Sequence, residues 1–222
     1  PELVMEVENG KRDGYLLYAE TCPQYLYFTE DDLREKGVWF KCAPTVRDKD
    51  RVRNMWKMLG KGYVDTIGSD HVPEHRSVME EIQKKGDMFM PVGGMPHIEH
   101  MVNALMNGVN NGWANLLDVV KALTERPAKI YGLYPKKGII QVGSDADIVI
   151  VDMNKELKVS RDTLITKAGW SSFEGMTLKG NPVLTMVRGE VVAEGREVLG
   201  EPGYGKFVPR LDSRCCQDKD LG

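Results

Sequence analysis

The ten residues VDTIGSDHVP, residues 64–73, place a short apolar strand directly before a polar loop. Two earlier stretches have the same form, LLYAE at 16–20 and VWFKCA at 38–43. The three predicted strands begin at residues 16, 38 and 64, so their spacings are 22 and 26 residues. Helical patterns separate them, most clearly over 48–60. This β–α order favours a parallel sheet, and three strands are less than half of a (β/α)8 barrel at about 30 residues per unit.

The remainder of the chain changes character near residue 135. We expect a long polar loop over 71–90, followed by helices over 95–106 and 114–123. Short strands of antiparallel type then follow, over 138–143, 146–151 and 183–192, with a turn at Arg188-Gly189. The sequence therefore predicts an α/β domain over 1–135, a β domain over 136–200 and an extended tail over 201–222.

Composition excludes several classes of protein. The 222 residues carry 33 acidic and 30 basic side chains, a net charge of −3, which gives no bulk electrostatic case for binding nucleic acid. No run approaches the ~20 apolar residues that a membrane-spanning helix needs. The four cysteines form no disulfide framework, so a reducing cytoplasm is expected. The chain begins at Pro1 and is short beside a barrel of about 250 residues, so we expect a missing N-terminal part.

The strongest candidate for chemistry is Asp70, because it follows the third strand. The C-terminal ends of barrel strands form the active-site face, and a carboxylate there can bind a metal or act as a general base. The alternative is an Asp that caps the next turn. Cys22 and Cys42 follow the other two strands, where small buried residues are favoured over nucleophiles. Arg47 can hold an anion or pair with a neighbouring carboxylate.

The histidines do not form a recognisable metal motif. The sequence has no H-x-H and no H-E-x-x-H. His97 and His100 have the spacing of one helix face, and we expect that face to be exposed rather than to bind zinc. Gly93-Gly94 offers backbone N–H groups to an anion or a substrate carbonyl, or forms only a flexible turn.

Several stretches occur in a characteristic order: AETCPQYL at 19–26, KCAP at 41–44, GSDH at 68–71, ERPA at 125–128 and KGIIQVGSDADIV at 137–149. SFEG at 172–175 and GEPG at 200–203 continue the series. Together they resemble the C-terminal half of a cyclic amidohydrolase, the group of dihydropyrimidinases (hydantoinases), allantoinases and dihydroorotases. The resemblance extends from residue 15 to about residue 211.

The resemblance implies a fold and a reaction. It implies a TIM barrel whose last three βα units lie in 1–135, followed by the C-terminal part of a small β-sandwich over 136–200. It implies hydrolysis of a cyclic amide C–N bond at a binuclear metal centre, usually zinc, in a homotetramer or dimer. Asp70 matches the family's metal-binding aspartate, which also moves the proton. The other ligands come from earlier strands that this chain lacks, so we expect the isolated chain to hold no zinc and to be inactive.

The resemblance also implies contacts for a small cyclic amide substrate. Ala43 and Gly93 match positions whose backbone pairs with the substrate's imide groups, although both differ from the family in side chain. Glu74 stands where dihydroorotases have a carboxylate-binding His, which counts against dihydroorotate. We therefore expect a hydantoinase-like enzyme, with an allantoinase or dihydroorotase as the alternative.

Two readings without catalysis stay open. One is a non-catalytic dihydropyrimidinase-related scaffold protein, which keeps the fold and loses the metal ligands. The other is a natural chain of 222 residues that acts as an interaction module, with apolar strand edges exposed unless a partner covers them.

Overall fold

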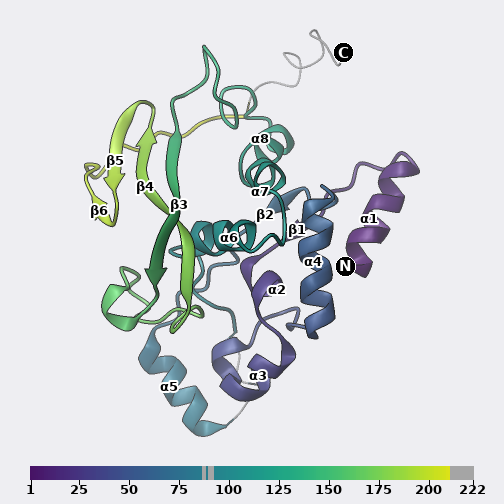
Figure 1. Cartoon of the computed structure of the whole chain (residues 1–222), viewed down its shortest axis with the longest axis vertical. Coiled ribbons are helices and arrows are strands. Elements are labelled where there is room, and N and C mark those ends of the chain that lie inside the picture. The colour runs from purple at the N-terminus through teal and green to yellow at the C-terminus, as the bar shows by residue number, and fades with distance from the viewer. Residues whose placement is uncertain (87–88, 90–92, 211–222) are drawn as a thin grey trace. The chain divides into compact units, whose positions relative to one another are not determined.

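A computed structural model describes residues 1–86, 89 and 93–210 (Figure 1). Residues 87–88 and 90 of the predicted loop lie outside the described residues, as do residues 91–92 and the predicted tail beyond residue 210 with Cys215 and Cys216. The chain divides into two compact units. The first comprises Pro1–Val119 and Met153–Asn181, and the second comprises Val120–Asp152 and Pro182–Gly222.

The first unit alternates helices with two short strands. Its elements are α1 (Glu2–Arg12), β1 (Glu20–Thr21), α2 (Pro23–Tyr27), α3 (Glu30–Lys36), the 3-10 helix η1 (Gly37–Phe40), α4 (Lys49–Gly60), β2 (Thr66–Ile67), α5 (Arg76–Lys85), α6 (Met101–Asn110) and the start of α7 (Leu116–Leu123). Strands β1 and β2 pair in parallel, with Glu20 opposite Thr66 and Thr21 opposite Ile67. The prediction of a parallel sheet is confirmed for these two strands.

The predicted strand at 16–20 is wrong over most of its length. Leu16 is 83% exposed, and Leu17 and Tyr18 are exposed as well. Pairing begins at Ala19, whose carbonyl accepts the backbone N–H groups of Asp65 and Thr66. Among the residues that the structure describes, no strand pairs with 16–18, so the apolar pattern there does not become a ladder.

The predicted strand at 38–43 is also wrong, because its first residues form η1. Gly37, at φ +63°, ends α3 and turns the chain. The side-chain oxygen of Gln83 then accepts the N–H of Val38 at 3.1 Å. Val38 and Phe40 are buried in the core from this short helical turn. The alternating apolar residues therefore mark buried positions and do not indicate a strand.

One loop prediction and one helix prediction need correction, while two helix predictions are confirmed, the first being the helix predicted at 48–60, which is present as α4. The predicted loop at 71–90 contains α5, whose Met79 and Ile82 are buried and whose N-terminus is capped by His75. The helix predicted at 95–106 begins only at Met101: Met95 forms a parallel bridge with His71, and only residues 98–100 form a turn. The helix predicted at 114–123 is present as α7.

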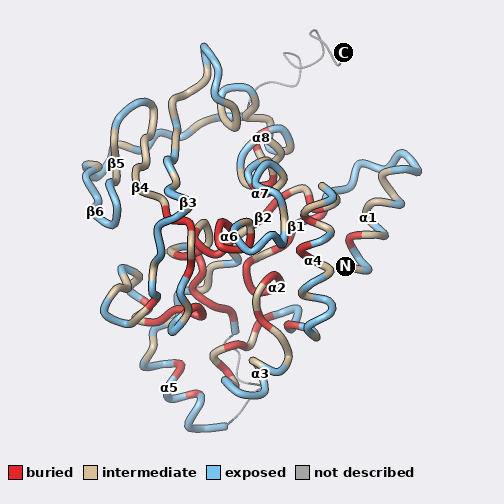
Figure 2. Tube along the Cα trace, viewed as in Figure 1, coloured by how far each residue is buried: buried red, intermediate tan, exposed pale blue. Residues whose placement is uncertain are grey.

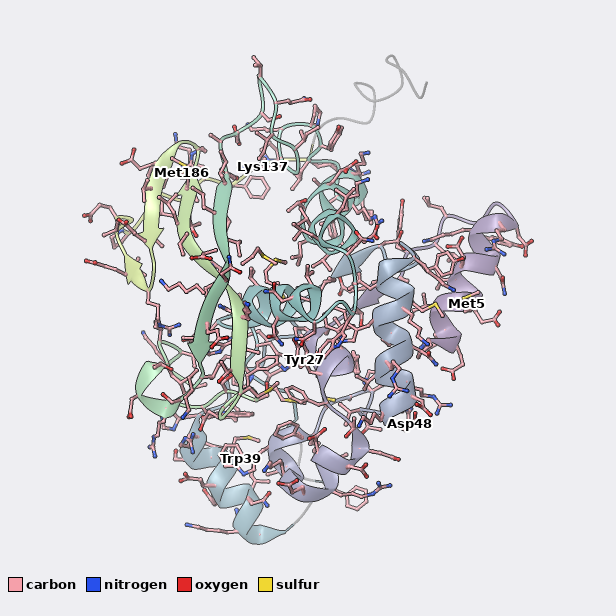
Figure 3. All side chains as sticks on the ribbon, viewed as in Figure 1. Met5, Tyr27, Trp39, Asp48, Lys137 and Met186 are labelled. Carbon is pink, nitrogen blue, oxygen red and sulfur yellow. The ribbon has the colours of Figure 1, made fainter. Side chains whose placement is uncertain are left out.

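One apolar cluster forms the core of the first unit, and Figure 2 shows much of it as red segments around α2 and α6. Its members are Phe28, Val38, Phe40, Cys42, Val46, Met79, Ile82, Met95, Ala104, Val159, Ala168, Trp170, Phe173 and Leu178. Tyr27, labelled in Figure 3, packs against this cluster, and its hydroxyl donates to the carbonyl of Ala104 at 2.6 Å. The cluster anchors the segments that carry the candidate site described below.

A four-stranded sheet has the order β3-β4-β5-β6 (Figure 1). Its strands are β3 (Ile148–Lys158), β4 (Thr177–Val187), β5 (Glu190–Glu194) and β6 (Glu197–Val198). The β4–β5 and β5–β6 pairs are antiparallel. The predicted turn at Arg188-Gly189 is confirmed, and both residues have positive φ, as the favoured two-residue hairpin turn requires.

The second unit also contains α8 (Glu125–Ile130) and the loop before β3. The strand predicted at 138–143 is wrong: it is a loop in which Ile140 and Val142 are exposed. Lys137, labelled in Figure 3, holds this loop through ion pairs with Asp145 at 2.9 Å and with Asp147. The domain boundary at residue 135 stays a prediction. Across the described residues, no helix has both the length and the apolar character needed to span a bilayer.

Candidate active site

Asp70 lies just past the end of β2, where the sequence predicts it. The N–H of Gly68 donates to the carbonyl of Thr21 at 2.9 Å, which extends the β1–β2 pairing to the strand end. Asp70 itself is exposed and has φ +44°, a left-handed conformation that costs a non-glycine residue about 1–2 kcal/mol. The surrounding contacts must therefore hold this backbone in place.

Reciprocal contacts with residues 95–98 hold the loop on both sides of Asp70. The Nδ1 atom of His71 accepts the backbone N–H groups of His97, at 3.1 Å, and Ile98, at 3.2 Å. The ring of His97 returns the contact, because its Nδ1 lies 3.1 Å from the carbonyl oxygen of Ser69. A parallel bridge between His71 and Met95 adds a further tie. These bonds fix Ser69 and His71, and so fix the left-handed backbone between them.

The expectation that His97 and His100 form an exposed helix face is wrong. Both side chains are 0% exposed, and both precede α6. His97 lies against Phe28 and Phe173, with ring centroids 6.4 and 6.0 Å away. Burial lowers the pKa of His97 to about 4, so the ring is neutral at physiological pH. The carbonyl of Ser69 can only accept, so Nδ1 carries the ring proton and donates it.

Gln24 contacts the carboxylate of Asp70 directly. Its side-chain Nε2 donates to Asp70 Oδ2 at 2.5 Å. Gln24 belongs to α2, the turn of helix that starts at Pro23 directly after β1, and it is only 1% exposed. Its Oε1 is buried without a hydrogen-bond partner among the described residues. The sequence motif contains Gln24, but nothing in its spacing marks it as a partner of Asp70. The available signal is a polar side chain in an otherwise apolar turn.

A cavity of about 280 Å³ opens at this strand end. It is lined by Lys41, Cys42, Ala43, Asp70, Val72, Gly93 and Gly94. The three site residues predicted from the sequence, Asp70, Ala43 and Gly93, therefore line one cavity. The N–H of Gly94 donates to the carbonyl of Lys41 at 2.7 Å, which joins two walls of the cavity.

Gly94 is required by this close approach. Its φ is +115°, and a Cβ atom there would lie 2.6 Å from the Cβ of Val72. Any other residue would push the two walls apart. Gly94 thus has a definite structural role and is not merely part of a flexible turn.

The two thiols near the cavity are poor nucleophiles. Burial, reinforced by the charges of Asp70 and Glu20, raises the pKa of Cys22 to about 12. Burial also raises the pKa of Cys42, whose Sγ donates to the carbonyl of Pro44 at 3.3 Å. A thiol attacks as its thiolate, so neither cysteine supplies an activated nucleophile. The prediction of a small buried residue holds for the burial of Cys42, which follows η1 rather than a strand, whereas Cys22 follows β1 and is only partly buried.

Two further candidates do not line the cavity. Glu74 turns its carbonyl to the indole N–H of Trp170 at 2.8 Å, and its carboxylate accepts the N–H of the neighbouring His75 at 3.3 Å. Arg47 is exposed, and Asp48 pairs with Arg51 instead. Glu74 is thus not among the residues that line this cavity, and the expectation that it repels a substrate carboxylate stays a prediction.

Asp70 is suited to bind one metal ion, but it needs other ligands. Gln24 engages Oδ2, while Oδ1 accepts no hydrogen bond from any described residue. A carboxylate with a free oxygen beside a cavity fits a ligand of zinc. Over 1–86, 89 and 93–210, no group of three or more His, Cys, Asp or Glu side chains is arranged to hold a metal ion.

Comparisons with known proteins place these features in a family. The model of the amidohydrolase family matches residues 16–192. The L-hydantoinase of Paenarthrobacter aurescens is 39% identical over 214 residues, which cover 95% of this chain and 46% of that protein. The dihydroorotase of Pyrococcus furiosus is 36% identical over 88% of this chain and 44% of its own length.

A solved structure agrees with the sequence matches. The L-hydantoinase (dihydropyrimidinase) from Arthrobacter aurescens superposes with a TM-score of 0.86 at 40% identity, over 93% of this chain and 46% of that structure. The chain thus has an α/β fold like that of the hydantoinases and spans about half the length of the curated relatives that it matches. With a family model covering most of its length, the chain belongs to the amidohydrolase family.

Proposed function

We propose that this chain is the C-terminal part of a metal-dependent cyclic amidohydrolase that opens the ring of a hydantoin or a dihydropyrimidine. The observation that carries the proposal is that Asp70, Ala43 and Gly93 line the same cavity. The names of the relatives, L-hydantoinase and dihydroorotase, support the class of substrate. In this proposal, residues 1–135 supply the last three βα units of the barrel and residues 136–200 supply part of the β-sandwich.

The proposed cofactor is a binuclear zinc centre, with Asp70 as one ligand. When bound, zinc supplies a hydroxide nucleophile at neutral pH and polarises the scissile carbonyl. The carboxylate of Asp70 accepts a proton during attack and returns it to the leaving nitrogen. Gln24 fixes the orientation of that carboxylate through Oδ2. The remaining ligands come from a part of the complete protein outside these 222 residues, in line with the 46% coverage of the relatives.

The backbone at Ala43 and Gly93 recognises the substrate ring in this proposal. Both residues line the cavity with Asp70, and their side chains are the smallest available, a methyl group at Ala43 and a hydrogen at Gly93. A peptide unit carries one N–H donor and one C=O acceptor, which are the groups needed to pair with the alternating acceptors and donors of a cyclic imide. Such backbone contacts tolerate the side-chain differences from the family.

The test is a substrate panel on the complete protein that carries residues 1–222, loaded with zinc. Hydantoin, dihydrouracil, allantoin and dihydroorotate are offered separately, and ring opening is followed by the loss of ring absorbance. We expect hydrolysis of hydantoin and dihydrouracil. A protein that binds two equivalents of zinc yet opens none of the four rings contradicts the proposal, and a protein that binds no zinc and opens none points to a scaffold role.

Oligomeric state is part of the same proposal. We expect the complete protein to be a homotetramer or dimer and to lie in the cytoplasm. Its oligomeric state is measured as the mass of the assembly by light scattering. A monomer at micromolar concentration contradicts this point without affecting the chemistry.

A further inference from the structure

A second cavity, of about 560 Å³, lies in the first compact unit and shares no lining residue with the cavity at Asp70. Its walls come from α2 and the residues after it, from α4 and from the turn after α6. Small-molecule sites commonly have volumes of about 300–1,000 Å³. We propose that this second cavity binds a flat aromatic anion, such as an aryl carboxylate. The proposal goes beyond the ring-opening reaction and depends neither on zinc nor on Asp70.

Three aromatic rings form apolar walls of the second cavity. Tyr27, Trp56 and Trp113 all line it, and their ring centroids lie 6.0, 5.6 and 5.4 Å apart in pairs. The hydroxyl of Tyr27 donates to the carbonyl of Ala104, and Nε1 of Trp56 donates to the carbonyl of Leu26, each at 2.6 Å. These two side chains therefore offer ring surface to a ligand rather than free donors. Trp113 is 44% exposed, so a flat ring packed beside it would bury apolar surface in edge-to-face or offset contact.

Three basic side chains of α4 line the same cavity. Lys49, Arg53 and Lys57 are spaced four residues apart, so they lie along one face of the helix. The described residues that line the cavity include no acidic side chain. Arg53 pairs with Asp50 at 3.2 Å, whereas neither Lys49 nor Lys57 forms an ion pair with any residue that the structure describes.

The charge of this helix face favours an anion. A lysine lays its stem along apolar surface and keeps its charged end in water, and Lys49 and Lys57 are both exposed. Their charged ends are therefore free to turn toward a ligand in the cavity. A cleft bordered by charges of one sign concentrates ligands of the opposite sign. A neutral aromatic compound would use only the rings, and an anion without a ring would use only the charges, so the two features together select an aromatic anion.

The experiment measures the dissociation constants of two probes on the complete protein by isothermal titration calorimetry. The probes are 2-naphthoate and 2-naphthamide, which share a fused aromatic ring and differ in charge. We expect 2-naphthoate to bind with a Kd of about 100 µM or tighter and 2-naphthamide to bind about tenfold more weakly, because charge-assisted contacts are the stronger ones.

Three variants test the walls of the second cavity. Trp113→Ala removes one ring, and the double variant Lys49→Met, Lys57→Met removes two charges but keeps apolar stems. The control Lys84→Met, Lys85→Met removes the same charge from α5, outside the cavity. We expect the first two variants each to weaken 2-naphthoate about tenfold, the α4 double variant to leave 2-naphthamide within about threefold, and the control to leave both probes within about threefold.

A fourth variant separates the two cavities. Asp70→Asn alters the other cavity, and it should leave the Kd of 2-naphthoate within about threefold of wild type. Loss of binding in this variant would place the probe at Asp70 and overturn the proposal.

Three further results overturn it: no binding of 2-naphthoate, equal affinity for the two probes, or the same weakening in the α5 control as in the α4 double variant. An unchanged Kd in a Trp113→Ala protein that circular dichroism shows to be folded does so as well. If Trp113→Ala does not fold, the comparison of the two double variants decides, since all four of those lysines are exposed. None of these measurements involves ring opening, so their failure leaves the proposed function standing.

Discussion

The hydrogen bond from Gln24 to Asp70 predicts a substitution that lowers activity but changes stability little. Replacing Gln24 with Met keeps the length of the side chain and removes its amide. A hydrogen bond to a charged acceptor contributes about 1.5–3 kcal/mol. Because Asp70 is exposed, water replaces part of the lost bond, and the lower figure applies. About 1.5 kcal/mol corresponds to roughly a tenfold loss of kcat in the complete protein.

Stability should not fall by the same amount. The Oε1 of Gln24 is buried without a partner among the described residues, and an unpaired buried carbonyl costs about 1–3 kcal/mol. Gln24→Met removes that atom, which offsets the lost bond to Asp70. We therefore expect the free energy of unfolding, measured in urea, to change by less than about 1 kcal/mol.

A matched control is Gln83→Met, which removes the side-chain bond to the N–H of Val38 outside the cavity. It should lower stability slightly and leave kcat within about twofold of wild type. The reasoning about Gln24 is refuted by a Gln24→Met protein with unchanged kcat, or by one whose loss of activity follows from unfolding.

Two further predictions concern the frame around the site. Gly108→Ala should lower the free energy of unfolding by about 1–3 kcal/mol, because its Cβ would lie 2.6 Å from Cζ2 of Trp56; Gly60→Ala, with contacts of 3.7 Å or more, should be near neutral in the same urea titration. The pKa of His97 is lowered from 6.5 to about 4, so between these pH values the unfolded chain binds more protons than the folded chain. The free energy of unfolding should therefore fall by on the order of 3 kcal/mol as the pH drops from 6.5 to 4. His97→Phe should flatten that part of the stability–pH curve, and an unchanged slope would count against the buried neutral ring.

The position of Asp70 could be predicted from the sequence because strand-end geometry is local. A short apolar run that stops at Gly68 places the following carboxylate at the end of a strand, whatever the rest of the chain does. The structure confirms β2 and its parallel pairing with β1. The convergence of Asp70, Ala43 and Gly93 on one cavity follows from the family resemblance, since spacing alone does not bring residues 43 and 93 together.

The secondary structure of residues 38–43 could not be predicted from the spacing of their apolar side chains. Alternating apolar residues are common to a half-buried strand and to a short turn of helix that enters a core. The choice depends on Gly37 at positive φ and on Gln83, which is distant in sequence and accepts the N–H of Val38. Tertiary contacts of this kind carry no local signal.

The burial of His97 could not be predicted from the sequence for a similar reason. The spacing of His97 and His100 indicates one helix face, and a lone His on such a face is usually exposed. The buried position of His97 is explained only by the carbonyl of Ser69 and the rings of Phe28 and Phe173. Gln24 likewise acquires its role from the fold, because α2 follows β1 and faces the end of β2. Functional partners that meet across parallel strands are the part of the site that sequence reasoning misses.

The most direct test of the account is the activity of Asp70→Asn in the complete, zinc-loaded protein. The substitution keeps the size of the side chain and removes both the charge for the metal and the proton acceptor. The measurement is kcat/KM for hydantoin, with the urea midpoint of each protein as the check on folding. We predict a loss of about a thousandfold or more with a folded protein, since positioned acid–base catalysis alone contributes about 10²–10⁴. A folded Asp70→Asn protein within tenfold of wild type would contradict the assignment of Asp70 and the cavity built around it.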